Sequence, residues 1–241
     1  MKLAIAAILA LCAPSVCFGL IGNGWRFTTA PIDGLSDVTF PFNIANAPHQ
    51  RGYYFAQQFN FKNVVRVGYT GLQPRVDFEG NSVIRGIFSS FQEGTTVAHP
   101  NCRLGANGGA GVSCSVDIIG DYSHTYNLVV ENIGGTTWRG RLVDDETDDS
   151  VVVGAWTLPE GSGKIVNGQV GFVDYFIWNG NPAYTCDSAP FTEATFYNPT
   201  TTTIGASGGK VTRVYEYGRC EGKVGFSWAK LPEGYDVKVG F

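Results

Sequence analysis

The chain has 241 residues, of which 44% are hydrophobic and 13% aromatic, and its formal net charge is −4. This length is sufficient for one well-buried core. Proteins that bind nucleic acids or anionic membranes carry clustered Lys and Arg, so this negative net charge argues against both kinds of partner. We therefore expect no nucleic-acid partner and no membrane partner.

The first 19 residues have the pattern of a secretory signal peptide. Lys2 precedes an apolar run from Leu3 to Cys12, and smaller residues lead to a cleavage site at Gly19. The run is too short to span a bilayer, and no other stretch approaches about 20 apolar residues. We predict that residues 1–19 are removed and that residues 20–241 form a single secreted domain, extracellular or in a cell wall.

An aromatic segment with period-two alternation covers residues 52–61. One face consists of Tyr53, Phe55, Phe59 and Phe61, interrupted by Gln57. The opposite face combines the ring of Tyr54 with the amide of Gln58, and Gln73 in the next segment adds a further amide. Rings and amides suit a carbohydrate, whose apolar face stacks on aromatics and whose hydroxyls need donors and acceptors. A solvated outer face is equally compatible with the pattern.

Four cysteines remain after the leader, namely Cys102, Cys114, Cys186 and Cys220. An even number in an oxidising compartment predicts two disulfides. Sequence proximity favours Cys102 with Cys114 and Cys186 with Cys220, and the other two connectivities stay open. The cysteines and the three histidines lack the close spacing of zinc sites, so we expect no metal and no cofactor.

The Gly-rich segment from Cys102 to Cys114 would be closed by the first disulfide. It lacks the Gly-Lys-Ser/Thr ending of a phosphate loop. We interpret it either as a rigid loop that presents Asn107 to a ligand or as a plain structural turn.

A β-hairpin is predicted in the middle of the chain. Apolar and polar residues alternate over 125–131 and again over 137–142. The acidic stretch 144–149 would form the turn that leads into the returning strand at 151–153. This stretch lacks the glycine and the distal glutamate of a helix-loop-helix calcium site, which favours a solvated turn.

An acidic residue interrupts the apolar pattern over residues 170–178. Asp174 shares a strand face with Val170, Phe172, Phe176 and Trp178. Burying a polar group without partners costs a few kcal/mol. The Asp174 carboxylate is therefore either held by structural donors or placed in a cleft, where it accepts hydrogen bonds from a sugar hydroxyl beside the Trp178 ring.

Clean alternation near the C-terminus predicts two more strands, at 223–228 and 235–241. After the leader, no segment longer than about ten residues keeps a helical apolar period. We predict an all-β protein with two antiparallel sheets packed face to face, as in a jelly roll or a concanavalin-like lectin sandwich.

An ordered series of short segments resembles a secreted β-rich family known as a domain of unknown function (number 3472). The segments are Gly52–Gln58, Gly68–Gln73, Gly86–Ser89, Gly105–Gly111, Gly154–Trp156 and Gly171–Phe176. The resemblance implies an extracellular β-sandwich with a link to carbohydrate, and it supplies no established catalytic residues. Related sequences often carry a glutamate where this chain has Ala106 or Asn107, which favours binding over catalysis.

We therefore predict a secreted carbohydrate-binding protein, lectin-like or associated with a cell wall, whose partner is a polysaccharide or glycan. The predicted site residues are Tyr54, Gln58, Gln73, Asn107, Asp174 and Trp178. One alternative is a polysaccharide hydrolase or lyase in which Asp174 pairs with a second carboxylate. The candidates for that second carboxylate are Glu93, Asp117 and Glu216. The other alternative is an effector that acts on a partner protein.

Overall fold

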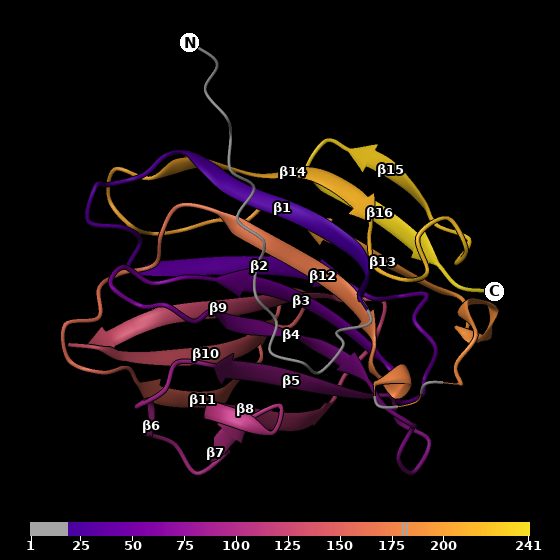
Figure 1. Ribbon diagram of the computed structural model, residues 1–241, viewed down its shortest axis with the longest axis horizontal. Coiled ribbons are helices and arrows are strands. Elements are labelled where there is room, and N and C mark those ends of the chain that lie inside the picture. The colour runs from indigo at the N-terminus through magenta and orange to yellow at the C-terminus, as the bar shows by residue number, and fades with distance from the viewer. Residues whose placement is uncertain (1–18, 180, 182) are drawn as a thin grey trace.

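The described part of the protein is an all-β sandwich of two eight-stranded antiparallel sheets, as the sequence predicted (Figure 1). The computed structural model describes residues 19–179, 181 and 183–241. Apart from Gly19, the predicted signal peptide lies outside the described residues. These residues form sixteen strands and two short 3-10 helices, η1 (Phe176–Trp178) and η2 (Cys186–Ser188).

Sheet 1 has the strand order β14-β1-β12-β3-β4-β5-β8-β7, so the N-terminal strand lies between two strands from the second half of the chain. Its strands are β14 (Ser207–Glu216), β1 (Gly19–Thr29), β12 (Gln169–Tyr175), β3 (Tyr53–Phe59), β4 (Gly68–Pro74), β5 (Val83–Ser90), β8 (Gly109–Ile119) and β7 (Cys102–Ala106).

Sheet 2 has the strand order β15-β16-β13-β2-β9-β10-β11-β6. Its strands are β15 (Ser227–Leu231), β16 (Gly234–Val239), β13 (Thr192–Tyr197), β2 (Asp37–Asn43), β9 (Thr125–Gly134), β10 (Thr137–Asp144), β11 (Ser150–Thr157) and β6 (Thr96–Val97). The predicted hairpin is β10–β11, in which Trp138 pairs with Trp156 and Leu142 with Val151.

Large aromatic side chains fill the space between the sheets. Phe88 of sheet 1 stacks on Trp156 of sheet 2 with ring centroids 4.5 Å apart. Trp25 of sheet 1 meets Phe40 of sheet 2 edge-on at 5.0 Å. All four rings are at most 2% exposed. Burial of such rings is the main favourable contribution to the stability of the sandwich.

Both disulfides of the described chain are the pairs that sequence proximity favoured. Cys102 bonds to Cys114 across β7 and β8, and Cys186 of η2 bonds to Cys220. Disulfides persist in oxidising compartments, so these two fit an extracellular protein. Within the described residues no helix is long and apolar enough to cross a membrane.

The predicted strand at residues 223–228 is wrong. Gly225 adopts a φ of +64°, which interrupts an extended chain, and β15 begins only at Ser227. Val224 is buried, but its carbonyl accepts a hydrogen bond from Gly240 N at 2.7 Å within a loop. The apolar alternation there reflects burial of a loop against the core, which periodicity alone does not distinguish from a strand.

Candidate functional site on the outer face of sheet 1

The outer face of sheet 1, which points away from sheet 2, carries a second apolar cluster besides the main core. The cluster consists of Tyr54, Ala56, Tyr69 and Phe172. Period-two alternation produces it, because Phe55 on β3 and Val173 on β12 point into the main core and their neighbours point outward. Asp174 shares this outward side with Phe172.

Three of the predicted site residues meet in one row across this face. Asp174 of β12 pairs directly with Tyr54 of β3. Extending the β3–β4 register by one residue places Gln73 beside Tyr54. Gln73 pairs with Arg85 of β5, which pairs with Asp117 of β8. The row therefore runs from one carboxylate to another over five neighbouring strands.

Asp174 is a buried acid whose side chain is only partly satisfied. It is 6% exposed, and within the described part of the chain its Oδ1 has no hydrogen-bond partner. Burial raises the pKa of Asp174 to about 7, against the opposing effects of hydrogen bonds from the Asn179 side chain and the Tyr175 backbone. Near neutral pH the carboxyl can therefore both release and accept a proton.

Tyr54 places a hydroxyl beside this acid. It is 6% exposed, and among the described residues its Oη also has no hydrogen-bond partner. Burial, the nearby Tyr69 and the charge of Asp174 hold the pKa of Tyr54 well above its usual range, so the group stays a hydrogen-bond donor. Its ring meets Phe172 edge-on at 5.6 Å, which fixes the direction of the hydroxyl.

The far end of the row is an ion pair that sequence reasoning did not identify. Arg85 donates from Nε and Nη2 to Asp117 at 2.5 Å and 2.6 Å, and this lowers the pKa of Asp117. Arg75 donates to the Gln73 amide oxygen. Alternation on β5 and β8 places Arg85 and Asp117 outward, but only their strand neighbourhood brings them together.

The carboxylate pair required by the polysaccharide-degrading alternative is not formed by Asp174 and Asp117. Four strand spacings separate their strands, which is roughly 19 Å along the sheet. Glycosidases hold their two carboxyl groups within about 10 Å of each other. Arg85 moreover neutralises Asp117, so this acid is committed to a structural pair.

The other three predicted site residues lie outside this row. Gln58 lies on the same face and pairs with Tyr69. Asn107 lies apart, at the exposed turn between β7 and β8, with a φ of +48°. Trp178 is 3% exposed in the main core, where it stacks on Tyr184 at 4.5 Å and donates to Ser188 Oγ at 3.1 Å. β12 ends at Tyr175, so alternation no longer places Trp178 beside Asp174.

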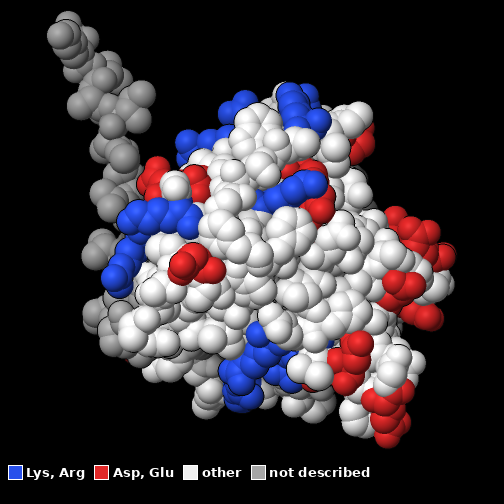
Figure 2. Space-filling view, turned by 90° about the vertical axis from the view of Figure 1, so that its right-hand side faces the viewer, with Lys and Arg blue, Asp and Glu red and all other residues white. Residues whose placement is uncertain are grey.

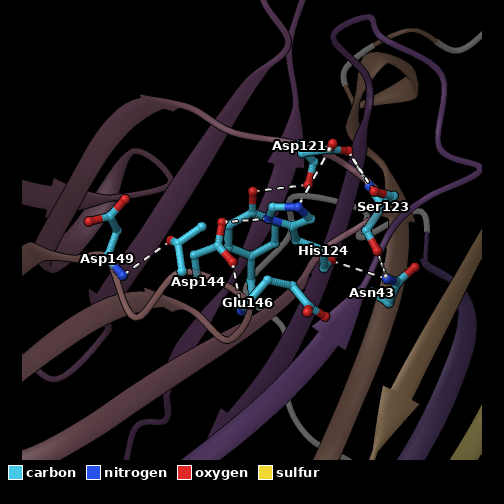
Figure 3. Close-up of polar contacts among 9 residues, drawn as sticks. Asn43, Asp121, Ser123, His124, Asp144, Glu146 and Asp149 are labelled. Carbon is cyan, nitrogen blue, oxygen red and sulfur yellow. Dashed lines mark hydrogen bonds and ion pairs between the residues drawn. The ribbon is translucent and has the colours of Figure 1, made fainter.

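A separate polar cluster surrounds His124, which lies in the β8–β9 loop beside the β10–β11 turn (Figure 3). His124 Nδ1 lies 2.8 Å from Asp144 Oδ2, and its Nε2 lies 3.8 Å from Asp121 Oδ2. The hydrogen bond with Asp144 raises the pKa of His124. Ser123 Oγ donates to Asp121 and not to the histidine, so the three side chains do not form a nucleophilic triad. Among the described residues no three His, Cys, Asp or Glu side chains are grouped to hold a metal ion.

Comparisons by sequence identify no relative. No family model matches the chain, and no curated protein matches it. The resemblance to the family of unknown function therefore stays a prediction.

Solved structures share the fold at low sequence identity. A Scytalido-glutamic peptidase bound to a peptide-based transition-state analog superposes with a TM-score of 0.50 and 12% identity, over 94% of this chain and 100% of that chain. A second structure of a Scytalido-glutamic peptidase, with a transition-state analog inhibitor, gives 0.49 and 11%. SCP-B, a member of the eqolisin family of peptidases in complex with the tripeptide Ala-Ile-His, gives 0.45 and 11%.

The prediction of a lectin-like carbohydrate-binding protein is wrong, because the solved structure with which this chain shares its fold at a TM-score of 0.50 is a peptidase. The two-sheet architecture that suggested a lectin is shared with a solved peptidase structure over the full length of that structure. A two-sheet sandwich hosts many unrelated functions, so the sequence pattern that identified the fold did not identify the activity. The chain thus has the fold of the Scytalido-glutamic peptidase, with Asp174 and Tyr54 side by side on the outer face of sheet 1.

Proposed function

We propose that the protein is a peptidase that uses Asp174 as its general acid–base residue. The observation that carries the proposal is the pairing of two buried groups with complementary roles. Asp174 Oδ1 is an acceptor and Tyr54 Oη is a donor, and neither has a hydrogen-bond partner within the described residues. Buried polar groups normally find partners, so an unsatisfied pair in one place points to a ligand. The shared fold with a peptidase suggests that this ligand is a peptide.

Each group supplies one part of peptide hydrolysis. The Asp174 carboxylate takes a proton from a water molecule, which attacks the peptide carbonyl carbon. The carbonyl oxygen becomes negative and accepts a hydrogen bond from the Tyr54 hydroxyl. Protonated Asp174 then returns the proton to the amide nitrogen as the carbon–nitrogen bond breaks. Phe172 and Tyr69 provide apolar surface beside the reacting bond.

The acidic residue of this candidate site differs from the one for which the peptidase of the same fold is named. That peptidase is named for a glutamate, whereas among the described residues of sheet 1 the outward acids are Asp174 and Asp117. Asp117 is paired with Arg85, so the proposal rests on Asp174.

The test is cleavage of an unfolded protein substrate, monitored by mass spectrometry from pH 3 to pH 9. We expect the wild type to cleave, with a rate that rises as pH approaches 7 because the base form of Asp174 is required. Asp174→Asn should lower the rate by at least about 100-fold and Tyr54→Phe by about 10-fold to 1000-fold. Glu160→Gln changes an exposed acid in a loop and serves as the control with an unchanged rate. A wild-type protein that cleaves nothing over this pH range, or an Asp174→Asn variant with full activity, would refute the proposal.

We also propose that the protein is secreted after removal of residues 1–19. The leader pattern in the sequence and the two disulfides support this location. N-terminal sequencing of the protein recovered from culture medium should begin at Leu20. Retention of Met1 in the extracellular protein would contradict the proposal.

A further inference from the structure

Charge is unevenly distributed over the surface, although the chain is acidic overall. On the face shown in Figure 2, Asp and Glu gather along the right-hand side, while Lys and Arg lie mainly at its top, left and bottom. A local positive region can thus exist in a protein whose net charge is −4. One such region coincides with a cavity.

The cavity lies where the edge strands of the two sheets come together. Its volume is about 600 Å³, and β1, β14, β15 and β16 contribute to its wall. Three basic residues from three different strands line it, namely Arg26, Lys210 and Lys230. Among the described residues that line it there is no Asp or Glu, and none of the three cations has an ion pair in the described part of the chain.

Two of these cations face each other directly in sheet 1. Arg26 of β1 pairs in register with Lys210 of β14. Val211, the next residue, is buried in the core, so Lys210 lies on the opposite side of the strand, facing outward. Like charges directly opposite on neighbouring strands are destabilising. A bound anion between them would remove this repulsion and satisfy both side chains.

The opposite wall is held in place by Asn198. Its Oδ1 accepts a hydrogen bond from Val211 N at 2.9 Å, and its Nδ2 donates to Glu233 Oε2 at 3.4 Å. Asn198 thereby ties β14 to the β15–β16 hairpin, which carries Lys230. It also holds Glu233 at the turn of that hairpin, and this acid does not line the cavity.

We propose that this cavity binds a small anion that bears phosphate or sulfate groups. Three convergent cations match a ligand of two or more negative charges better than a single carboxylate, and charge-assisted hydrogen bonds to such oxyanions are strong. The site is distinct from the Asp174 row. Arg26 lies seven residues along β1 from Gly19, the partner of Asp174, which is roughly 23 Å of extended strand. The inference therefore does not depend on the proposed peptidase activity.

The test is the thermal unfolding of the mature protein in increasing inorganic pyrophosphate at low ionic strength. A ligand that binds only the folded state raises the Tm. We expect pyrophosphate to raise the Tm of the wild type, whereas sodium acetate at equal ionic strength should not. Lys210→Gln and Lys230→Gln should each raise the half-saturating concentration about tenfold, which corresponds to one lost charge-assisted bond. Parallel titrations with inorganic phosphate and with sulfate distinguish the two kinds of oxyanion.

The matched control is Arg103→Gln, which removes one exposed positive charge on β7 at the opposite edge of sheet 1. It should respond to pyrophosphate like the wild type. Lysines on exposed edge strands also protect against edge-to-edge association. If pyrophosphate has no more effect than acetate, or shifts all variants equally, Lys210 and Lys230 serve only that protective role and the proposal is overturned.

Discussion

Asp174 is a residue at which burial opposes ionisation. Its pKa is about 7 in the folded protein and near 3.8 in an unfolded chain. The folded state therefore binds the proton more tightly, and the free energy of unfolding falls as pH rises from about 4 to about 7. The full decrease in the free energy of unfolding is about 4 kcal/mol. Asp174→Asn should remove this decline and unfold at higher urea concentration than the wild type at pH 8.

Urea unfolding of both proteins between pH 4 and pH 8 measures this effect without any substrate. Glu160→Gln, which changes an exposed acid, should keep the wild-type pH dependence. An Asp174→Asn protein whose stability still falls in parallel with the wild type would show that Asp174 is ionised at little cost.

His124 gives the opposite case, in which a neighbour stabilises the charged form. The hydrogen bond with Asp144 raises the pKa of His124 above its ordinary value of 6.5. Its contribution to stability is therefore fully present below pH 6.5 and is lost as pH rises through the folded pKa. NMR titration of the His124 ring should give a midpoint above 6.5 that falls in Asp144→Asn. The same midpoint in both proteins would show that Asp144 does not hold the imidazolium.

At the scale of elements, a disulfide of sheet 1 packs directly against a glycine of sheet 2. A Cβ added at Gly154 of β11 would lie 2.5 Å from the sulfur of Cys102 and within contact of Cys114. The Cys102–Cys114 bond of sheet 1 thus packs on bare backbone of sheet 2. Gly154→Ala should destabilise the protein by about 1–3 kcal/mol through overpacking.

A double-mutant cycle isolates this contact. Replacement of both cysteines by serine alone should cost about 2–4 kcal/mol. In that background Gly154→Ala should destabilise the protein less than it does in the wild type, because no disulfide holds the two side chains rigidly against the added methyl group. Urea unfolding of the four proteins gives the coupling energy. If the two changes in unfolding free energy simply add, the added methyl group does not clash with the disulfide.

At the scale of the whole molecule, the sandwich is closed by strands from opposite ends of the chain. β1 pairs with β12 and β14, so sheet 1 cannot be completed until residues beyond 200 are available. The long chain segment between these strands must close into a loop, at a cost in conformational entropy, before their stabilising contacts form. With the disulfides intact, refolding should therefore be slow, in milliseconds to seconds or longer. Stopped-flow fluorescence of the buried tryptophans measures it, and refolding within microseconds would contradict this view.

The alternation in the sequence predicted the face that carries the candidate site, because neighbouring residues on a strand must point to opposite sides. It predicts Tyr54 and Gln58 on one side and Phe55 on the other, and the structure confirms this. Alternation also predicts Gln57 on the apolar side, where the residue is 2% exposed. Its amide lies over Gly171 of β12, and that neighbour was not foreseeable from β3 alone.

The pairing of strands was beyond prediction because it depends on which distant segments share a sheet. Asp174 and Tyr54 are 120 positions apart, yet β12 and β3 hold them side by side. The prediction for Trp178 is wrong for a local reason, since β12 ends at Tyr175 and the following turn directs the Trp178 ring into the core. Arg85 and Asp117 look like ordinary surface charges until β5 and β8 align them.

The sequence by itself determined the all-β class, the alternation of faces, the central hairpin and the residues from which the two disulfides form. These follow from local periodicity and from the chemistry of cysteine, which act at short range along the chain. The tertiary structure alone decided that the chain shares the fold of the Scytalido-glutamic peptidase, that Asp174 and Tyr54 form one buried pair, and that three cations line one cavity. Each of these depends on strand order, which is set by the packing of the whole core and is encoded in no single segment.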